Sequence, residues 1–253
     1  MRVFALAVLV LPGWFSMAAA GADTLKSQVE IIDGTIYSWK NCNSEVYGEN
    51  CQRYNAGGVR NLGVGRVGDD ERRSIFGVPG WDGVMPDSSH LLLYCKAEND
   101  SNNRRVFIYP LTAGFIEGSE LAWGWGDYPD PDSGVTWLHA WLDTGDRDSC
   151  GWSMPGGDFT SAVACTVLVS DTGRYVRTRS FNRVLSFWDS SGQDYGFIAI
   201  NQNAAPSDHS LKVFGSSEGD TLCRPMVVLF YPDTMQAGTG VRRRRGTEQS
   251  LIR

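Results

Sequence analysis

The sequence predicts an all-β fold, built as a single β-sandwich or barrel of short strands. Runs of β-branched and aromatic residues alternate with polar or glycine-rich gaps, and turn signals recur about every ten residues. Glycine and tryptophan are abundant, at 29 and 9 residues. A sandwich can occupy about 200–250 residues as one unit, so the length of the chain does not require two domains.

The first expected element is a hairpin. Val29–Ile32 and Thr35–Tyr37 are short apolar runs that flank Asp33-Gly34. This dipeptide is typical of a two-residue type I′ turn between antiparallel strands.

Six later runs are expected to be strands, because each is rich in residues that favour a pleated sheet and is bounded by polar or glycine-containing residues. They are Ser89–Cys95, Arg105–Tyr109, Ser161–Val169, Tyr195–Ile200, Leu211–Phe214 and Met226–Tyr231. A short helix is expected within residues 175–188, where apolar side chains recur at partly helical spacing: Tyr175, Val176, Val184, Leu185 and Trp188.

The first 22 residues have the three parts of a secretory signal peptide. Arg2 supplies the positive charge, Val3–Leu11 is an apolar run, and Ala20-Gly21-Ala22 fits a cleavage site. The apolar run is shorter than the roughly 20 residues of a membrane span. We therefore expect cleavage before Asp23, or alternatively after Ala20, and a secreted or cell-surface protein with no transmembrane segment.

The remaining chain is expected to form one domain over residues 23–232 and a basic, flexible tail over residues 233–253. Cleavage removes one arginine and no acid, which changes the formal net charge from −6 to −7. An acidic domain argues against nucleic-acid binding, which needs a basic surface. The tail contains Arg242–Arg245, interpreted as a solvated end, an anchor to an acidic surface or a protease site.

Disulfides are expected, because the number of cysteines is even and export implies an oxidising compartment. The pairing stays open, with Cys42–Cys51 and Cys150–Cys165 as the most favoured local loops. Zinc is not expected, since no C-x-x-C motif is present and the histidines are scattered. The six cysteines are Cys42, Cys51, Cys95, Cys150, Cys165 and Cys223.

Separated segments resemble the DNRLRE domain family, in the order in which the family has them. Trp152–Asp158 is similar to the family's W-x-x-P-G-G-D motif. Other matching segments are Asn55–Gly65, Arg73–Phe76, Leu91–Tyr94, Phe115–Gly118, Gly134–Trp137, Val184–Trp188, Asp194–Gly196, Phe214–Glu218 and Arg224–Val228. The chain departs from the family at Phe76–Pro79, where the family's aspartate is missing, and at Phe115, where the family has tryptophan.

This resemblance implies a jelly-roll β-sandwich, since that is the fold of the family. The family includes carbohydrate-binding modules of polysaccharide-degrading enzymes, which implies a secreted, non-catalytic module that binds polysaccharide. The motif residues Trp137, Trp152 and Trp188 are expected in the core, because each can bury a large apolar area.

Ligand contacts are expected instead from aromatic residues that lie among glycines. Trp123, Trp125 and Tyr128 fall within Ala122–Tyr128, and Trp81 is flanked by Gly80 and Asp82-Gly83. Aromatic rings can stack on the apolar faces of sugar rings, and loops of this composition can expose them. Packing beneath the loop is the alternative.

Two acidic loops could hold a structural Ca²⁺, which prefers six to eight oxygen ligands. The metal candidates are Asp143, Asp146 and Asp148, and a second loop contains Asp127, Asp130 and Asp132. Neither loop has the twelve-residue EF-hand pattern, and a solvated polar loop is the alternative.

Glycoside hydrolysis would need two carboxylates at a defined separation. Glu117 and Asp158 are the candidate pair for a polysaccharide hydrolase or lyase, although Glu117 is expected to brace a turn and Asp158 to close the Pro-Gly-Gly turn. No motif of a nucleophile elbow, zinc protease or phosphate loop is present. A third hypothesis is that the chain is a structural subunit of an extracellular fibre or surface layer, which assembles with itself or with other surface proteins.

Overall fold

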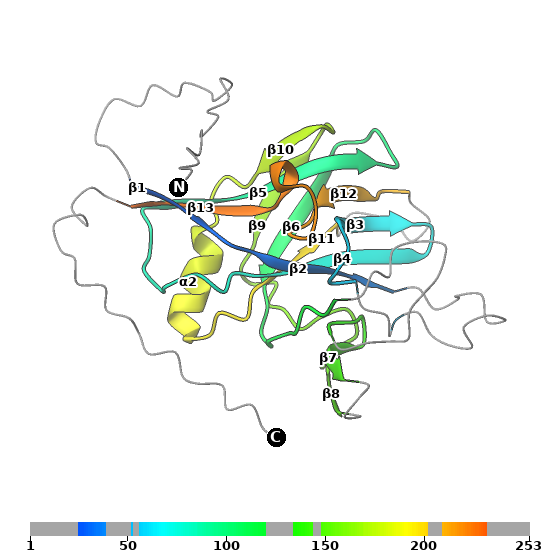
Figure 1. Ribbon diagram of the computed structural model, residues 1–253, viewed down its shortest axis with the longest axis horizontal. Helices are drawn as coiled ribbons and strands as arrows, with labels where there is room; N and C mark the ends of the chain where they lie inside the picture. The colour runs from blue at the N-terminus through cyan, green and yellow to red at the C-terminus, as the bar shows by residue number, and fades with distance from the viewer. Residues whose placement is uncertain are drawn as a thin grey trace, which may run out of the picture.

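The computed structural model describes residues 25–38, 52, 56–119, 134–143, 148–201 and 209–231. Antiparallel strands dominate this part of the chain, which confirms the all-β prediction (Figure 1). The strands are β1 (Leu25–Val29), β2 (Ile32–Tyr37), β3 (Asn61–Val67), β4 (Asp70–Gly77), β5 (Ser88–Glu98), β6 (Arg104–Pro110), β7 (His139–Asp143), β8 (Asp148–Gly151), β9 (Cys165–Val169), β10 (Arg174–Arg177), β11 (Phe197–Ile200), β12 (Lys212–Gly215) and β13 (Met226–Tyr231). The helices are α2 (Asn182–Ser191) and the 3-10 turn η2 (Thr221–Cys223).

Eleven strands form one curled sheet, and β7 and β8 form a separate hairpin. The order along the curled sheet is β1-β13-β5-β12-β3-β4-β11-β6-β9, with β10 on β5 and β2 on β4. We call β1, β13, β5, β10 and β12 the β5 half, and β2, β4, β11, β6 and β9 the β11 half. Strand β3 joins them, because it pairs with β12 at Asn61–Val64 and with β4 at Gly65–Val67.

The central core lies between the two halves. Alternate residues of the strands face it, as the period of two along a strand requires. From the β5 half come Leu91, Leu93 and Phe214, and from the β11 half come Val106 and Phe197. The six later runs that the sequence predicts as strands each overlap one strand of the structure, namely β5, β6, β9, β11, β12 and β13.

A second, outer core covers the other face of the β11 half. It joins Ile75 of β4 and Ile198 of β11 to residues from the connection between β6 and β9, including Val135, Trp137 and Trp152. The β7–β8 hairpin belongs to this connection and lies below the curled sheet in Figure 1. The β11 half is therefore buried on both faces at β4 and β11, whereas Leu168 at its β9 edge is exposed.

Helix α2 packs its apolar side against the central core. Val184, Leu185 and Trp188 are buried, and the backbone N–H of Gly192 donates to the carbonyl of Trp188 to end the helix in a left-handed turn. The predicted helix therefore exists, but it begins later than the sequence indicated. Tyr175 and Val176 lie on β10 instead, because Arg174–Arg177 pairs with β5.

The predicted hairpin around Asp33-Gly34 is wrong. Both residues lie inside β2, which pairs with β4, whereas β1 pairs with β13. The chain thus crosses from one half of the sheet to the other at residues 30–31. Asp33 is held inside the strand, because its backbone N–H donates to Glu117 and its Oδ2 accepts from the backbone N–H of Ser217.

Candidate functional site

The three motif tryptophans lie in the core, as the sequence predicts. Trp188 is 1% exposed in the central core, and Trp137 and Trp152 are buried in the outer core. The indole Nε1 of Trp152 donates to the carbonyl of Thr136 at 2.9 Å. The guanidinium of Arg73 lies 4.6 Å above the ring of Trp137.

The Pro-Gly-Gly turn is built by Asp158 and the glycines. Asp158 accepts hydrogen bonds from the backbone N–H groups of Ser153 and Met154, at 2.8 and 3.1 Å. Gly156 has φ of +96°, and a Cβ there would lie 2.6 Å from Arg73 Nη1. Asp158 therefore closes this turn, as the sequence indicated, and only glycine fits at position 156.

Of the predicted ligand residues, only Trp81 lies in the described part of the chain. Its ring is half-buried against the central core, 5.5 Å from the ring of Trp188. Met85 and Phe187 are the other half-buried side chains at the edge of this core. Trp123, Trp125 and Tyr128 lie outside the described residues.

The predicted calcium loop begins at the last residue of β7 and ends at the first residue of β8. Asp143 and Asp148 oppose each other in the register of the two strands, and Asp146 lies outside the described residues, as do Asp127, Asp130 and Asp132. Within the described ranges, no three histidine, cysteine, aspartate or glutamate side chains are grouped so that they could hold a metal ion.

The four cysteines in the described ranges, Cys95, Cys150, Cys165 and Cys223, are free thiols. The predicted Cys150–Cys165 disulfide is therefore not formed. Cys150 is exposed on β8, whereas Cys165 faces the central core from β9. Burial raises the pKa of Cys95 to about 11 and that of Cys165 to about 12, so both stay protonated at neutral pH. Cys42 and Cys51 lie outside the described residues.

The carboxyl groups of Asp33 and Glu117 lie near Glu218. Asp33 is fully buried, and its burial raises the pKa of its carboxyl to about 8, with further increases from Glu117 and Glu218. Burial also raises the pKa of Glu117, which accepts a hydrogen bond from the backbone N–H of Asp33 at 2.6 Å. Glu117 thus braces β2, and Asp33 is protonated at neutral pH.

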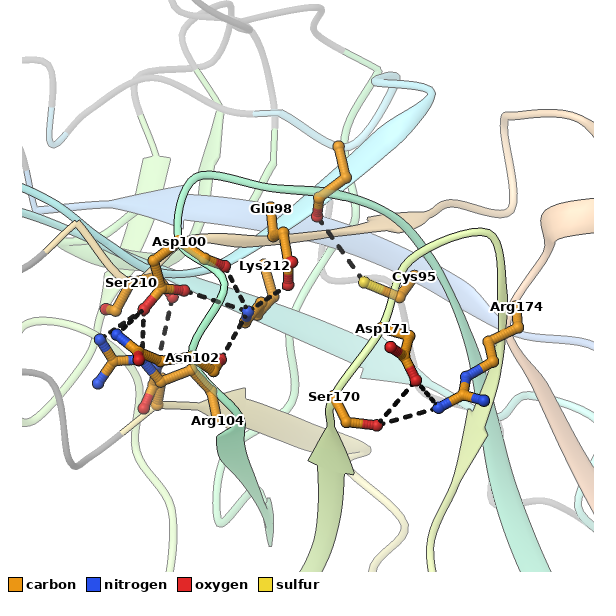
Figure 2. A network of polar contacts seen from close by, with 12 residues as sticks. Cys95, Glu98, Asp100, Asn102, Arg104, Ser170, Asp171, Arg174, Ser210 and Lys212 are labelled. Carbon is orange, nitrogen blue, oxygen red and sulfur yellow. Dashed lines mark hydrogen bonds and ion pairs between the residues drawn. The ribbon is translucent and has the colours of Figure 1, made fainter.

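A fully buried lysine ties β12 to the turn between β5 and β6. Figure 2 shows Lys212 pointing into a ring of oxygen atoms from this turn. Its Nζ pairs with the carboxylate of Glu98 and lies 3.1 Å from Asp100 Oδ1, and it donates to the carbonyls of Asp100 and Asn102 at 3.0 and 2.9 Å.

Arg104 completes this network with hydrogen bonds of 2.9 and 2.6 Å to Asp100 Oδ2. Burial tends to raise the pKa of Asp100, but the bonds from Arg104 and Lys212 outweigh it and hold that pKa below its ordinary value. Glu98 and Asp100 are each paired with a cation in the folded state. The network therefore acts as a structural link between β12 and the turn that joins β5 to β6.

The outward face of the β5 half carries half-exposed aromatic side chains. The rings of Tyr94 and Tyr175 meet edge to face with centroids 5.1 Å apart, and those of His90 and Phe230 do so at 6.0 Å. Leu92 lies between these pairs on β5 and is also half-exposed. These side chains of intermediate exposure make this face the apolar and aromatic part of the β5 half that reaches solvent.

Neither this surface nor the buried lysine was identified from the sequence. The signal for the surface was present, since β5 alternates between buried and half-exposed residues with period two. The role of Lys212 has no local signal, because its partners lie more than 100 residues away along the chain.

No protein-family model matches the chain, and no curated protein matches it. No helix in the described ranges is long and apolar enough to cross a membrane.

Proposed function

We propose that this chain is an exported, non-catalytic module that binds polysaccharide at a cell surface or in the environment. The proposal includes the jelly-roll architecture of the DNRLRE family, to which the ordered motifs are similar. It is supported by the all-β fold and by the burial of the motif tryptophans Trp137, Trp152 and Trp188.

The observation that carries the proposal is the aromatic outward face of the β5 half. Tyr94, Tyr175, His90 and Phe230 are half-exposed on a sheet, with no insertion comparable to the one that covers the β11 half in the described residues. Aromatic side chains combine a large apolar surface with a polar end, which suits them to the apolar faces and hydroxyl groups of sugars.

The predicted contacts of the glycine-rich segment remain part of the proposal. Trp123, Trp125 and Tyr128 are proposed to contact the glycan, and Asp143, Asp146 and Asp148 to bind a structural Ca²⁺. Cleavage before Asp23 and a Cys42–Cys51 disulfide are proposed for the exported protein.

Affinity electrophoresis on a panel of neutral and acidic polysaccharides tests the function. We expect at least one glycan to retard the wild-type protein. Tyr94→Ala should reduce this retardation, as should the double variant Trp123→Ala with Trp125→Ala, while Leu168→Ala on the exposed side of β9 should not. If no glycan retards the wild type, the proposal is wrong.

The non-catalytic part of the proposal has its own test. Incubation with each retarding glycan should release no reducing sugar above that of a buffer control. Release that disappears in Glu117→Gln or Asp158→Asn protein would instead identify a polysaccharide-active enzyme.

A further inference from the structure

The outward face of the β5 half contains an exposed arginine between its aromatic pairs. Arg177 of β10 and Met226 of β13 both pair with Leu92, on opposite edges of β5. Directly paired residues of antiparallel strands project to the same face. Arg177 therefore shares the face of Leu92, Tyr94 and His90.

We infer that this face binds a polysaccharide of uronic acids, with Arg177 contacting a sugar carboxylate and the aromatic pairs contacting the neighbouring sugar rings. The inference rests on the proposed function and names its ligand class. We call the surface formed by His90, Leu92, Tyr94, Tyr175, Arg177 and Phe230 the tyrosine–arginine surface.

Of the seven arginines on the described strands, five are paired with an acid, whereas Arg105 and Arg177 are not. Arg66, Arg72, Arg73, Arg104 and Arg174 each form an ion pair with an aspartate or glutamate. In the described part of the chain, no carboxylate lies within 4 Å of the Arg177 guanidinium. A guanidinium presents two parallel N–H donors, a geometry that matches a carboxylate.

The charges around the surface favour an anionic ligand, although the chain as a whole carries a net charge of −6. Lys96 lies two residues after Tyr94 on β5, at the register shift between β5 and β12, and is exposed. The hydroxyl of Tyr175 donates to the carbonyl of Arg224, whose side chain is exposed. Two acids lie nearby: Asp220, whose Oδ1 accepts the backbone N–H of Leu222, and the exposed Asp87, whose backbone N–H donates to the carbonyl of Phe230.

The spacing of the aromatic pairs suits a chain of sugars rather than one sugar. His90 and Tyr94 are four residues apart on one strand, which corresponds to about 13 Å. Arg177 lies opposite the midpoint, Leu92. A ligand that touches both pairs must therefore be extended and must pass the guanidinium.

A second copy of the chain is a less suitable occupant of this surface. A two-fold symmetric contact brings each patch against an identical patch, so Arg177 and Lys96 would face the same cations of the partner. Like charges that face each other across an interface are unfavourable. A polyanion has the complementary charge.

The test compares alginate, polygalacturonate and hyaluronate with the carboxyl-reduced form of each, by affinity electrophoresis. We expect one or more of the acidic polymers to bind the wild-type protein, with about tenfold weaker binding after carboxyl reduction. Arg177→Gln should weaken binding to the acidic polymer by about tenfold, and Tyr94→Ala should also weaken it.

Arg105→Gln is the matched control, because Arg105 is also an exposed strand arginine that pairs with a leucine, Leu168. It should change the affinity less than about twofold, since it lies on the outward side of the β11 half. Equal losses in the Arg177 and Arg105 variants would indicate unspecific attraction of charge and would overturn the inference.

Two results separate the inference from the proposed function. Equal binding of the acidic and reduced polymers, with no effect of Arg177→Gln, overturns the inference while polysaccharide binding stands. If binding is lost in the Trp123→Ala and Trp125→Ala double variant but not in Arg177→Gln or Tyr94→Ala, the inference is likewise overturned while polysaccharide binding stands. Absence of binding to every glycan overturns both, and concentration-dependent dimers that Arg177→Gln alters would identify a second copy as the occupant.

Discussion

The two halves of the curled sheet differ in what lies on their outward faces. In the β11 half, Ile75 and Ile198 face the outer core and are fully buried. In the β5 half, the corresponding face carries Leu92 and Tyr94, which are half-exposed. The same antiparallel architecture therefore serves as a packing layer on one side and as an open surface on the other.

This difference is visible in the strand sequences. Strand β11 reads Phe-Ile-Ala-Ile and is buried throughout, as expected for a strand covered on both faces. Strand β5 alternates, with only every second residue buried. A substitution on the outward face should accordingly be costly where the outer core covers β4 and β11, and mild in the β5 half.

The largest effect is expected at Lys212, in the strand ladder that joins the two halves. Lys212→Met removes the cation that Glu98 and Asp100 share, at a position where the lysine side chain is fully buried. We expect the free energy of unfolding to fall by about 3–5 kcal/mol, measured by urea denaturation. Lys96→Met, at an exposed lysine of β5, is the control and should cost less than about 0.5 kcal/mol. Similar values for the two variants would show that the network contributes little.

A direct comparison of the halves uses two outward-facing aliphatic residues. Ile198→Ala creates a cavity in the outer core and should cost about 2–4 kcal/mol. Leu92→Ala removes a half-exposed side chain and should cost less than about 1.5 kcal/mol. Chemical denaturation of both variants gives the difference. Equal losses of stability in the two variants would mean that the outward face of the β5 half is also covered in solution.

The buried acid of β2 should make the stability depend on pH. The folded protein holds the proton of Asp33 up to about pH 8, whereas an unfolded aspartate loses it near pH 4. Between these values the folded state binds more protons, so this group lowers stability as pH rises, by up to about 1.4 kcal/mol per pH unit.

Asp33→Asn keeps an oxygen for the N–H of Ser217 and removes the titration. We therefore expect the variant to gain stability over the wild type at pH 7.5 and to gain little at pH 4.5, in urea denaturation at both pH values. Asp87→Asn, at an exposed carboxylate, serves as the control. A difference between Asp33→Asn and wild type that does not change with pH would contradict the assignment.

The smallest effect on stability is expected at the tyrosine–arginine surface itself. Arg177→Gln and Arg105→Gln change exposed side chains that form no ion pair with described residues, so each should alter the free energy of unfolding by less than about 0.5 kcal/mol. A thermal melt of each variant checks this. A large loss of stability in Arg177→Gln would mean that Arg177 stabilises the β5 half. The role of this surface in glycan binding would then be judged from the Tyr94→Ala variant.

Much of the fold could be predicted from residue patterns. The run Met226–Tyr231 is a strand with the predicted bounds, and the motif tryptophans are buried because a large apolar ring rarely stays in water. The candidate site was less predictable. Asp33-Gly34 carries a strong local turn signal, yet pairing of β2 with β4 and the contacts of Asp33 with Glu117 and Ser217 override it.

The sequence by itself determined which residues alternate along the strands and which side chains are large and apolar, because these follow from local periodicity and composition. Only the tertiary structure decided that the connection between β6 and β9 covers the β11 half, that Lys212 lies among oxygen atoms of a distant turn, and that Arg177 shares a face with Tyr94. Each of these depends on contacts between residues far apart along the chain, whose pairing is selected by the packing of the whole sheet rather than by any local pattern.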